Sequence, residues 1–320
     1  MYGTDRTDRT DGWHSLPDSP RGLLIPGFCG KDFKAHSSEA GCIDPANDCV
    51  FLFRNYLGGI VKLIVLGAGY ATRLYPLTLN QPKPLLAVAG KPMIEHVLDN
   101  LKPITNIDHI YIVTNARFAE HFQRWADNYG ASHVGAPITI INDLSTDDSN
   151  KLGAIGDLNL VLTEAQIDDS IVVVAGDNLF SESLEDFGEF CRAHDAPVLG
   201  VYDVGNLDEI KKYNAIEIDA AGQITFFEEK PAQPKSTLTG IALYYYPRWA
   251  LPLIREYLAE GNHADQPGLL VQWFYPRTPF YVWQVPGIWF DVGSKETLEE
   301  ANRIFADLKR GQINNLKVEL

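Results

Sequence analysis

The sequence predicts an α/β fold built on a doubly wound, mostly parallel sheet. Two observations indicate it. Apolar, β-branched runs alternate with amphipathic stretches from Ile60 to Asp203, and the first run ends in the glycine-rich turn Gly67-Ala68-Gly69. This alternation places helices on both faces of a sheet, because each parallel crossover needs a long connection, usually a helix. After Tyr213 the pattern changes to a hairpin and further strands, which predicts a mixed sheet with an inserted β-rich portion.

The first half of the chain, residues 60–205, carries the alternating elements. Pro92 favours a helix start, because its missing N–H costs no hydrogen bond in the first helical turn. The run from Ser170 to Ala175 is strongly β-branched and predicts a buried strand. The predicted strands are 60–66, 109–114, 138–141, 170–175 and 198–203, and the predicted helices are 93–101, 117–128, 157–165 and 182–194. This order is that of a Rossmann-like sheet.

The second half, residues 206–320, contains the β-rich portion. A hairpin is predicted from 215–218 and 223–227 around the turn Asp219-Ala220-Ala221-Gly222. Ser294 is a suitable N-cap for the last helix, since its hydroxyl can accept a free backbone N–H. The remaining predicted strands are 241–246, 280–285 and 288–290, and the predicted helices are 249–260 and 295–309.

Composition excludes several classes of function. The formal net charge is −15, with 42 acidic against 27 basic residues, which argues against nucleic-acid partners and anionic membrane surfaces. No apolar run reaches transmembrane length and no signal peptide is evident, so we expect a cytoplasmic protein. Of the four cysteines only Cys191 follows residue 59, which leaves no disulfide framework in the remainder.

Residues 1–59 differ from the rest of the chain. Thr4 to Asp11 is a literal three-residue repeat, and beyond it no helical or strand period is found. Cys29, Cys42 and Cys49 lack a known metal-ligand spacing. We therefore expect a disordered or non-native extension, with Val61 at the native start. A protein that begins at residue 61 is expected to keep full activity and thermal stability.

The stretch after the first strand is a positive island in an acidic protein. No acidic residue lies between Asp48 and Glu95, whereas the interval contains Arg54, Lys62, Arg73, Lys83 and Lys91. Prolines at 76, 82, 84 and 92 stiffen the loop that carries them. The glycines allow a ligand to approach the backbone closely. Together these features suit a polyphosphate.

Three kinds of glycine-rich phosphate loop were compared with this stretch. A P-loop needs a Lys-Ser/Thr pair, and a dinucleotide fingerprint needs a third glycine near Thr72 and an acid about 20 residues later. Neither is present. The stretch instead resembles the signature of the sugar-1-phosphate nucleotidyltransferases, and it departs from that signature at two positions, where Gly67 replaces Ala and Ala71 replaces Gly. The matching segments are Leu66 to Leu74, Pro76-Leu77-Thr78, Pro82 to Leu86, and Gly90 to Ile94.

The resemblance implies roles for residues of the first half, which becomes a nucleotide-binding half. Arg73 and Lys83 would be catalytic. The chain has Leu152-Gly153-Ala154 where many relatives have Gly-Leu-Ala-Gln against the base, so thymine, uracil and cytosine stay open. The implied nucleotide-binding residues are Leu66, Gly67, Ala68, Gly69, Thr72, Arg73 and Gly153.

Two aspartates are candidate Mg²⁺ ligands. Asp177 directly follows a predicted parallel strand, where ligands collect, and carboxylate oxygens suit this cation. The segment Gly176 to Phe180 resembles the Gly-Asp-Asn-Ile-Phe of glucose-1-phosphate thymidylyltransferases, which implies a metal role for Asp177 and a substrate role for Asn178. By the same resemblance Asp291, in Trp289-Phe290-Asp291-Val292-Gly293, is the second metal ligand.

The second half resembles the family's sugar-phosphate-binding half. Glu229 could accept sugar hydroxyls, and Lys230 offers a point charge for a phosphate. The chain has Tyr213-Asn214-Ala215 where the thymidylyltransferases have Tyr-Gly-Val. The implied substrate-binding residues are Asn178, Asn214, Glu229, Lys230 and Gly240.

The resemblance implies transfer of a nucleotidyl group from an NTP, dTTP or UTP, to a sugar 1-phosphate such as glucose 1-phosphate. Pyrophosphate and an NDP-sugar result, which suits nucleotide-sugar and polysaccharide biosynthesis. Two other classes stay open: a cytidylyltransferase for a phosphorylated amino alcohol, and a non-catalytic regulator that binds nucleotide sugars. Such regulators usually lose a catalytic or metal-binding residue, whereas this chain has all four candidates, Arg73, Lys83, Asp177 and Asp291. Base, sugar and oligomeric state, a homo-oligomer included, are not fixed by the sequence.

Overall fold

The structure is a computed structural model that describes residues 59–132 and 135–311. The predictions for the N-terminal extension and for Cys29, Cys42 and Cys49 lie outside these residues. Within them Cys191 is a buried free thiol. None of the helices in the described ranges is long and apolar enough to cross a bilayer.

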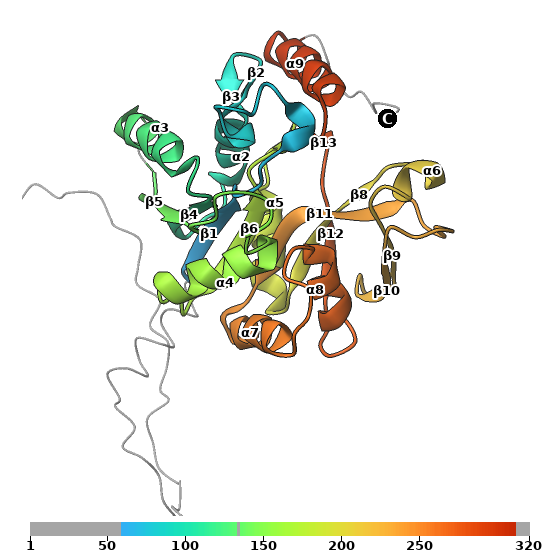
Figure 1. Ribbon diagram of the computed structural model, residues 1–320. Helices are drawn as coiled ribbons and strands as arrows, with labels where there is room; N and C mark the ends of the chain where they lie inside the picture. The colour runs from blue at the N-terminus through green and yellow to red at the C-terminus, as the bar shows by residue number, and fades with distance from the viewer. Residues whose placement is uncertain (1–58, 133–134, 312–320) are drawn as a thin grey trace, which may run out of the picture. The chain divides into compact units, whose positions relative to one another are not determined.

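A central sheet carries the fold, with the strand order β12-β8-β11-β6-β1-β4-β5 (Figure 1). β11 is antiparallel to β6 and β8, and the other neighbouring pairs are parallel. The predicted mixed, mostly parallel sheet is therefore confirmed. The strands are β1 (Val61–Leu66), β4 (Ile107–Thr114), β5 (Ile138–Asn142), β6 (Ser170–Ala175), β8 (Val198–Asp203), β11 (Leu238–Tyr246) and β12 (Tyr281–Gln284).

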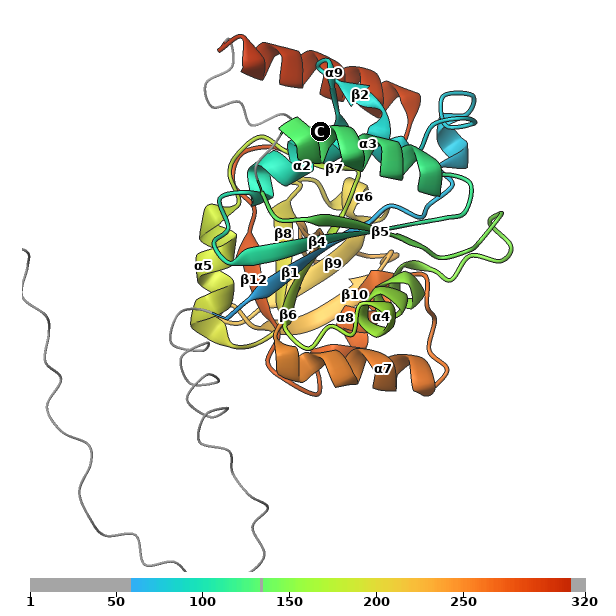
Figure 2. The same ribbon diagram turned by 90° about the vertical axis from the view of Figure 1, so that its left-hand side faces the viewer.

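Helices cover both faces of this sheet (Figure 2). Successive side chains of a strand point to opposite faces, so Leu63 and Val65 of β1 enter one core cluster and Ile64 enters the other. The first cluster packs under α2 (Met93–Leu101), α3 (Ala119–Ser132) and α5 (Glu185–His194). The second packs under α4 (Ala154–Glu164), α7 (Leu251–Ala259) and α8 (Pro267–Phe274).

Smaller elements join the sheet to the site. The hairpin of β9 (Asn214–Ile218) and β10 (Ile224–Glu229) follows the short helix α6 (Leu207–Ile210) and is inserted between β8 and β11. β7 (Asn178–Phe180) pairs with β13 (Trp289–Asp291), and β2 (Ala87–Val88) pairs with β3 (Lys91–Pro92). α9 (Lys295–Lys309) closes a third core cluster. Its predicted cap is confirmed, since the Ser294 side chain accepts the Thr297 N–H.

Several predicted bounds are corrected. α4 begins at Ala154 rather than 157 because Gly153, at φ 81°, ends the loop before it. α5 begins at Glu185 rather than 182, β11 begins at Leu238 rather than 241, and α7 begins at Leu251 after a 3-10 turn. The prediction lacked α8, the short α6, and the two- and three-residue strands β2, β3 and β7, which are too short to show a period. β11 and β12 belong to the central sheet, so the second half extends that sheet as well as inserting a hairpin.

Candidate active site

The site is positioned by two neighbouring parallel strands that end together. Leu66 at the end of β1 is in register with Ala175 at the end of β6, and the Gly176 N–H donates to the Leu66 carbonyl at 3.0 Å. The signature loop therefore begins beside Asp177. This is the edge of an open parallel sheet at which ligands bind.

The backbone of the signature loop accounts for the glycine at position 67 and shows what the alanine at position 71 costs. A Cβ at Gly67 would lie 3.2 Å from the Phe122 ring and from the Val113 carbonyl oxygen, which is tighter than ordinary packing. Ala71 adopts the left-handed conformation, with φ 48° and ψ 44°, at a cost of about 1 kcal/mol that a glycine would not carry. The buried Thr78 hydroxyl donates to the Ala71 carbonyl at 2.8 Å and holds this turn.

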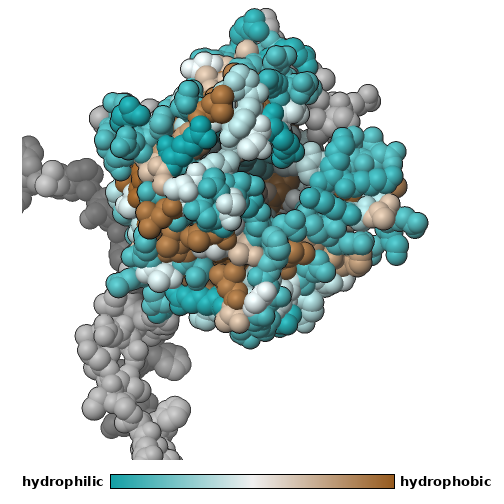
Figure 3. All heavy atoms as spheres, in the orientation of Figure 1, coloured by the Kyte–Doolittle hydropathy of each residue, from teal (hydrophilic) through white to brown (hydrophobic). Residues whose placement is uncertain are grey.

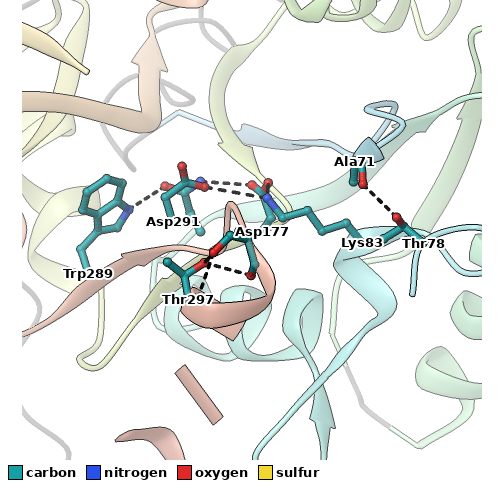
Figure 4. A network of polar contacts seen from close by, with 9 residues as sticks. Ala71, Thr78, Lys83, Asp177, Trp289, Asp291 and Thr297 are labelled. Atoms are coloured by element: carbon teal, nitrogen blue, oxygen red, sulfur yellow. Dashed lines mark hydrogen bonds and ion pairs between the residues drawn. The ribbon is translucent and has the colours of Figure 1, made fainter. Parts of the chain in front are cut away.

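Lys83 lies between the two predicted metal ligands (Figure 4). Its Nζ is 2.5 Å from Asp177 Oδ2 and 3.9 Å from Asp291 Oδ1. Asp291 reaches Asp177 because β13 pairs with β7, which places Asp291 opposite Asn178. The structure thus brings together three residues that are far apart in the sequence.

The electrostatics of the pair favour a bound cation. Burial and then the neighbouring Asp177 raise the pKa of Asp291, whereas Lys83 and Arg73 oppose that shift. Two carboxylates on one edge repel each other unless positive charge lies between them. At present the Lys83 ammonium supplies that charge. Arg73 and Thr72 are exposed beside Gly69, so this part of the loop is open to a ligand.

The carboxylate donor set fits Mg²⁺. The described ranges contain no group of three or more His, Cys, Asp or Glu residues that could hold a metal. Mg²⁺ commonly takes one or two carboxylates and completes its shell with substrate phosphates and waters. Asp177 and Asp291 would supply two such carboxylates.

A hydrogen-bonded aromatic group holds Asn178. The Trp289 indole N–H donates to Asn178 Oδ1 at 2.6 Å, and Asn178 Nδ2 is 3.2 Å from Asp177 Oδ1. The Tyr202 and Tyr213 rings lie 5.7 Å and 5.9 Å from the Trp289 ring. Asn178 is therefore an oriented neighbour of Asp177.

Glu229 and Lys230 lie at the end of β10. The Lys230 N–H donates to the Tyr213 carbonyl at 2.7 Å, which links this turn to the aromatic group around Trp289, while the Lys230 side chain is exposed. The Glu229 carboxylate lies against Gly268 in the first turn of α8, and a side chain at Gly268 would displace this carboxylate. Burial raises the pKa of Glu229, and Lys230 opposes the shift.

Asn214 and Gly240 bind to each other. The Asn214 amide accepts the Gly240 N–H at 2.6 Å and donates to the Gly240 carbonyl at 3.1 Å. A larger residue at position 240 would also be obstructed, since a Cβ there would lie 2.7 Å from the Leu199 side chain. In the structure the Asn214 amide thus joins β9 to β11, and its predicted sugar contact stays a prediction.

Gly153 packs against another backbone. A Cβ there would lie 2.7 Å from the Ala264 carbonyl oxygen and from the Asp265 Cα. The Ile155 N–H donates to that same carbonyl at 2.7 Å. Lys151 Nζ pairs with Asp265 at 2.9 Å. The start of α4 is therefore joined to the segment that precedes α8.

Sequence reasoning did not identify a buried polar group beside the loop. Tyr70, Ser145, Asp143 and Asp157 are all buried and interact in a chain. Asp157 lies in the first turn of a helix, where an acid is ordinary, so the sequence carried no signal for it. Helix α8 did have a signal, namely Pro267 at its first position followed by apolar residues at helical spacing.

The surface is hollowed between the part that carries α9 and the part that carries β9 and β10, over the region of β11 (Figure 3). The hollow therefore lies between two parts of the second half of the chain, α9 on one side and the β9–β10 hairpin on the other. Such concave places are where small ligands bind.

Comparisons with known proteins agree with this arrangement. The sequence model of the family described as Nucleotidyl transferase matches residues 62–307. The glucose-1-phosphate thymidylyltransferase of Mycobacterium tuberculosis is 28% identical over 264 residues, which cover 80% of this chain and 85% of that protein. The bifunctional protein GlmU of Methanocaldococcus jannaschii is 24% identical over 244 residues, and the match spans about half (54%) of its length.

Solved structures show the same fold. A Bacillus anthracis protein assigned as a glucose-1-phosphate thymidylyltransferase, solved with sucrose, has a TM-score of 0.65 and 26% identity, over 80% of this chain and 98% of that one. A UDP-glucose pyrophosphorylase complexed with UDP-glucose has a TM-score of 0.64 at 21% identity, over 77% of this chain and 98% of that one, and supports the fold alone. With the family match over residues 62–307, the resemblance found in the sequence is confirmed: the chain belongs to the nucleotidyl transferase family.

Proposed function

We propose that this protein transfers a nucleotidyl group from dTTP or UTP to glucose 1-phosphate or a closely related sugar 1-phosphate, releasing pyrophosphate. The observation that supports it most is the grouping of Lys83, Asp177 and Asp291 beside the signature loop, with Nζ–O distances of 2.5 Å and 3.9 Å. The thymidylyltransferase and uridylyltransferase names among the relatives support the choice of base.

The chain's residues would act mainly by positioning charge. A sugar phosphate is mostly dianionic near neutral pH, because its second pKa is about 6. Its oxygen can therefore attack the α-phosphorus in line, without a general base, while pyrophosphate leaves. Arg73 would stabilise charge that develops on the triphosphate, and Lys83 would stabilise the α-phosphate. Lys230 would hold the sugar phosphate.

Asp177 and Asp291 would hold Mg²⁺ in this proposal. When bound, the cation supplies positive charge that screens the repulsion between the two phosphates. Burial and then the neighbouring Asp177 raise the pKa of Asp291, and a bound cation would offset the repulsion between the two carboxylates. The indole N–H of Trp289 fixes the Asn178 amide so that its Nδ2 donates to Asp177 Oδ1, which would orient this carboxylate for the cation.

Pyrophosphate release over a matrix of NTPs and sugar 1-phosphates tests the proposal. We expect release with Mg²⁺ only when both substrates are present, and fastest with dTTP or UTP and glucose 1-phosphate. Release that needs no sugar phosphate would indicate hydrolysis. Absence of release with every pair would refute the proposal.

A second candidate is a cytidylyltransferase for a phosphorylated amino alcohol. The rings of Tyr202, Tyr213 and Trp289 beside Asn178 favour it, since aromatic faces bind quaternary ammonium groups. Trp289 is only 4% exposed, however, so its ring packs against its neighbours. Turnover of CTP with choline phosphate, compared with that of glucose 1-phosphate, separates the two candidates.

A further inference from the structure

Two buried carboxyl groups touch each other beside the signature loop. Asp143 follows β5, and Asp157 lies in the first turn of α4; their exposed fractions are 7% and 5%. The two side chains are in hydrogen-bond contact. Two ionised carboxylates in contact in a buried place would repel each other strongly, so the pair shares a proton.

The surrounding donors show which carboxyl group is ionised. Asp143 Oδ1 accepts the Ser145 N–H at 2.7 Å, and its Oδ2 accepts the Ser145 hydroxyl at 2.9 Å. Asp157 Oδ1 is buried and has no hydrogen-bond partner among the described residues. A buried carboxylate needs donors, and a protonated carboxyl group can itself donate. Asp143 therefore carries the negative charge, and Asp157 keeps the proton.

The pair connects the signature loop to the start of α4. The Tyr70 hydroxyl lies 3.1 Å from Ser145 Oγ. Because Ser145 donates its proton to Asp143, it accepts from Tyr70, a buried residue of the signature loop. At the other end the Asp157 N–H donates to the Gly153 carbonyl at 2.7 Å. Tyr70, Ser145, Asp143 and Asp157 thus form one directed chain.

We propose that the proton shared by Asp143 and Asp157 positions the nucleoside-binding edge of the site, by holding Tyr70 and the first turn of α4 at the separation that the nucleotide requires. This inference rests on the proposed function, in which Gly153 and the signature loop bind the nucleotide. Asp143 and Asp157 are positioning residues. Loss of the proton would place two negative charges in contact, move the two segments apart, and weaken NTP binding while the chemical step is spared.

The charged groups around the pair set the pH at which this occurs. Burial, Asp143 and, more weakly, Asp265 raise the pKa of Asp157 to about 8, and Lys151 opposes them. At the other end burial is the main cause that raises the pKa of the Tyr70 hydroxyl; Asp143 and Asp147 add to it, whereas Ser145 and Arg117 lower it. Tyr70 therefore stays protonated while Asp157 titrates just above neutral pH.

The test compares NTP binding at pH 7 and pH 9 in three proteins. In the wild type the KM and Kd for dTTP or UTP should rise by about tenfold, since pH 9 lies one unit above the pKa of Asp157. Asp157→Asn keeps a donor toward Asp143 and cannot lose it, so its values should change less than twofold. Asp265→Asn also removes one acidic charge but leaves the pair in place, so the rise should persist and begin at a slightly lower pH, because Asp265 helps to raise the pKa of Asp157. The kcat and the KM for sugar 1-phosphate should not follow this profile.

An infrared measurement tests the pair without any substrate. The wild type at pH 7 should show the band of a protonated carboxyl group that disappears near pH 8 to 9 and is absent from Asp157→Asn. Lack of that band, or the same pH profile of the NTP Kd in the wild type and Asp157→Asn, would overturn the inference. If Asp157→Asn does not fold, Asp143→Asn serves, because it removes the charge that repels an ionised Asp157, and its NTP Kd should therefore rise less than that of the wild type between pH 7 and pH 9. A missing pyrophosphate release would refute the proposed function alone, since NTP binding and the band are read separately.

Discussion

Lys83 reaches the two predicted metal ligands from a loop that leaves the sheet at β1. Its Nζ lies 2.5 Å from Asp177 Oδ2, and its side chain is 12% exposed. A partly buried ammonium beside carboxylates is a strong preorganised charge, because the surroundings screen it less than water does. The same residue can therefore stabilise a phosphate that enters this edge.

Lys83→Ala and Arg73→Ala should each lower kcat by about a hundredfold or more, as expected when a donor to transition-state charge is lost. Steady-state pyrophosphate release checks this, with circular dichroism to show that the fold is kept. Lys62→Ala is the matched control. It removes a lysine of the same positive island that pairs with Asp108 at 2.8 Å near the start of β1, and it should leave kcat within about twofold. Near-normal turnover in Lys83→Ala would exclude that residue from the mechanism.

Asp157 should make the folding stability depend on pH. Its pKa is about 8 in the folded protein against 3.8 for the free side chain, so between these values the folded state binds more protons than the unfolded state. The contribution of Asp157 to the free energy of unfolding should therefore fall as pH rises from about 4 to about 8, by up to about 1.4 kcal/mol per pH unit. Urea unfolding of the wild type and Asp157→Asn measures it, and the difference should grow in favour of the variant over that range. Parallel curves would contradict the raised pKa.

At the scale of elements, the junction between α4 and the segment before α8 depends on Gly153. Gly153→Ala should destabilise the fold by more than about 2 kcal/mol, because φ is 81° and the new Cβ would lie 2.7 Å from two backbone atoms. Gly261→Ala is the control with a similar φ of 79° but open space around it, and it should cost only about 1 kcal/mol. Chemical denaturation of both variants measures the difference. Equal losses of stability in the two variants would show that the closeness of Ala264 and Asp265 to the added Cβ does not contribute to the destabilisation.

Elements with a clear period were predictable from the sequence, and short ones were not. The branched apolar residues of β6 indicate a buried strand, and Ser294 indicates the start of helix α9. β7 and β13 are three residues each, and only their pairing brings Asp291 to Asp177. That long-range pairing has no local signal, so the sequence alone pointed to the second metal ligand mainly through family resemblance.

Across the whole molecule, the candidate phosphate-binding and metal-binding residues could be found from motifs, whereas the buried residues beside them could not. Lys83 and Asp177 lie in continuous signatures. The Asp143–Asp157 pair arises because β5 and α4 approach each other in three dimensions, and neither acid is unusual where it stands in the sequence. Asn214 shows the converse. It stands at a position of the family motif, but in the structure its side chain accepts a hydrogen bond from the backbone of β11.

The central claim is that this edge joins an NTP to a sugar 1-phosphate. The most direct measurement is ³¹P NMR of one reaction that contains the protein, Mg²⁺, dTTP or UTP, and glucose 1-phosphate. We predict that pyrophosphate and an NDP-sugar appear in equal amounts as both substrates disappear, and that Asp177→Asn forms neither. Pyrophosphate accompanied by free nucleoside monophosphate, or substrates that remain unchanged with wild-type protein, would contradict the account.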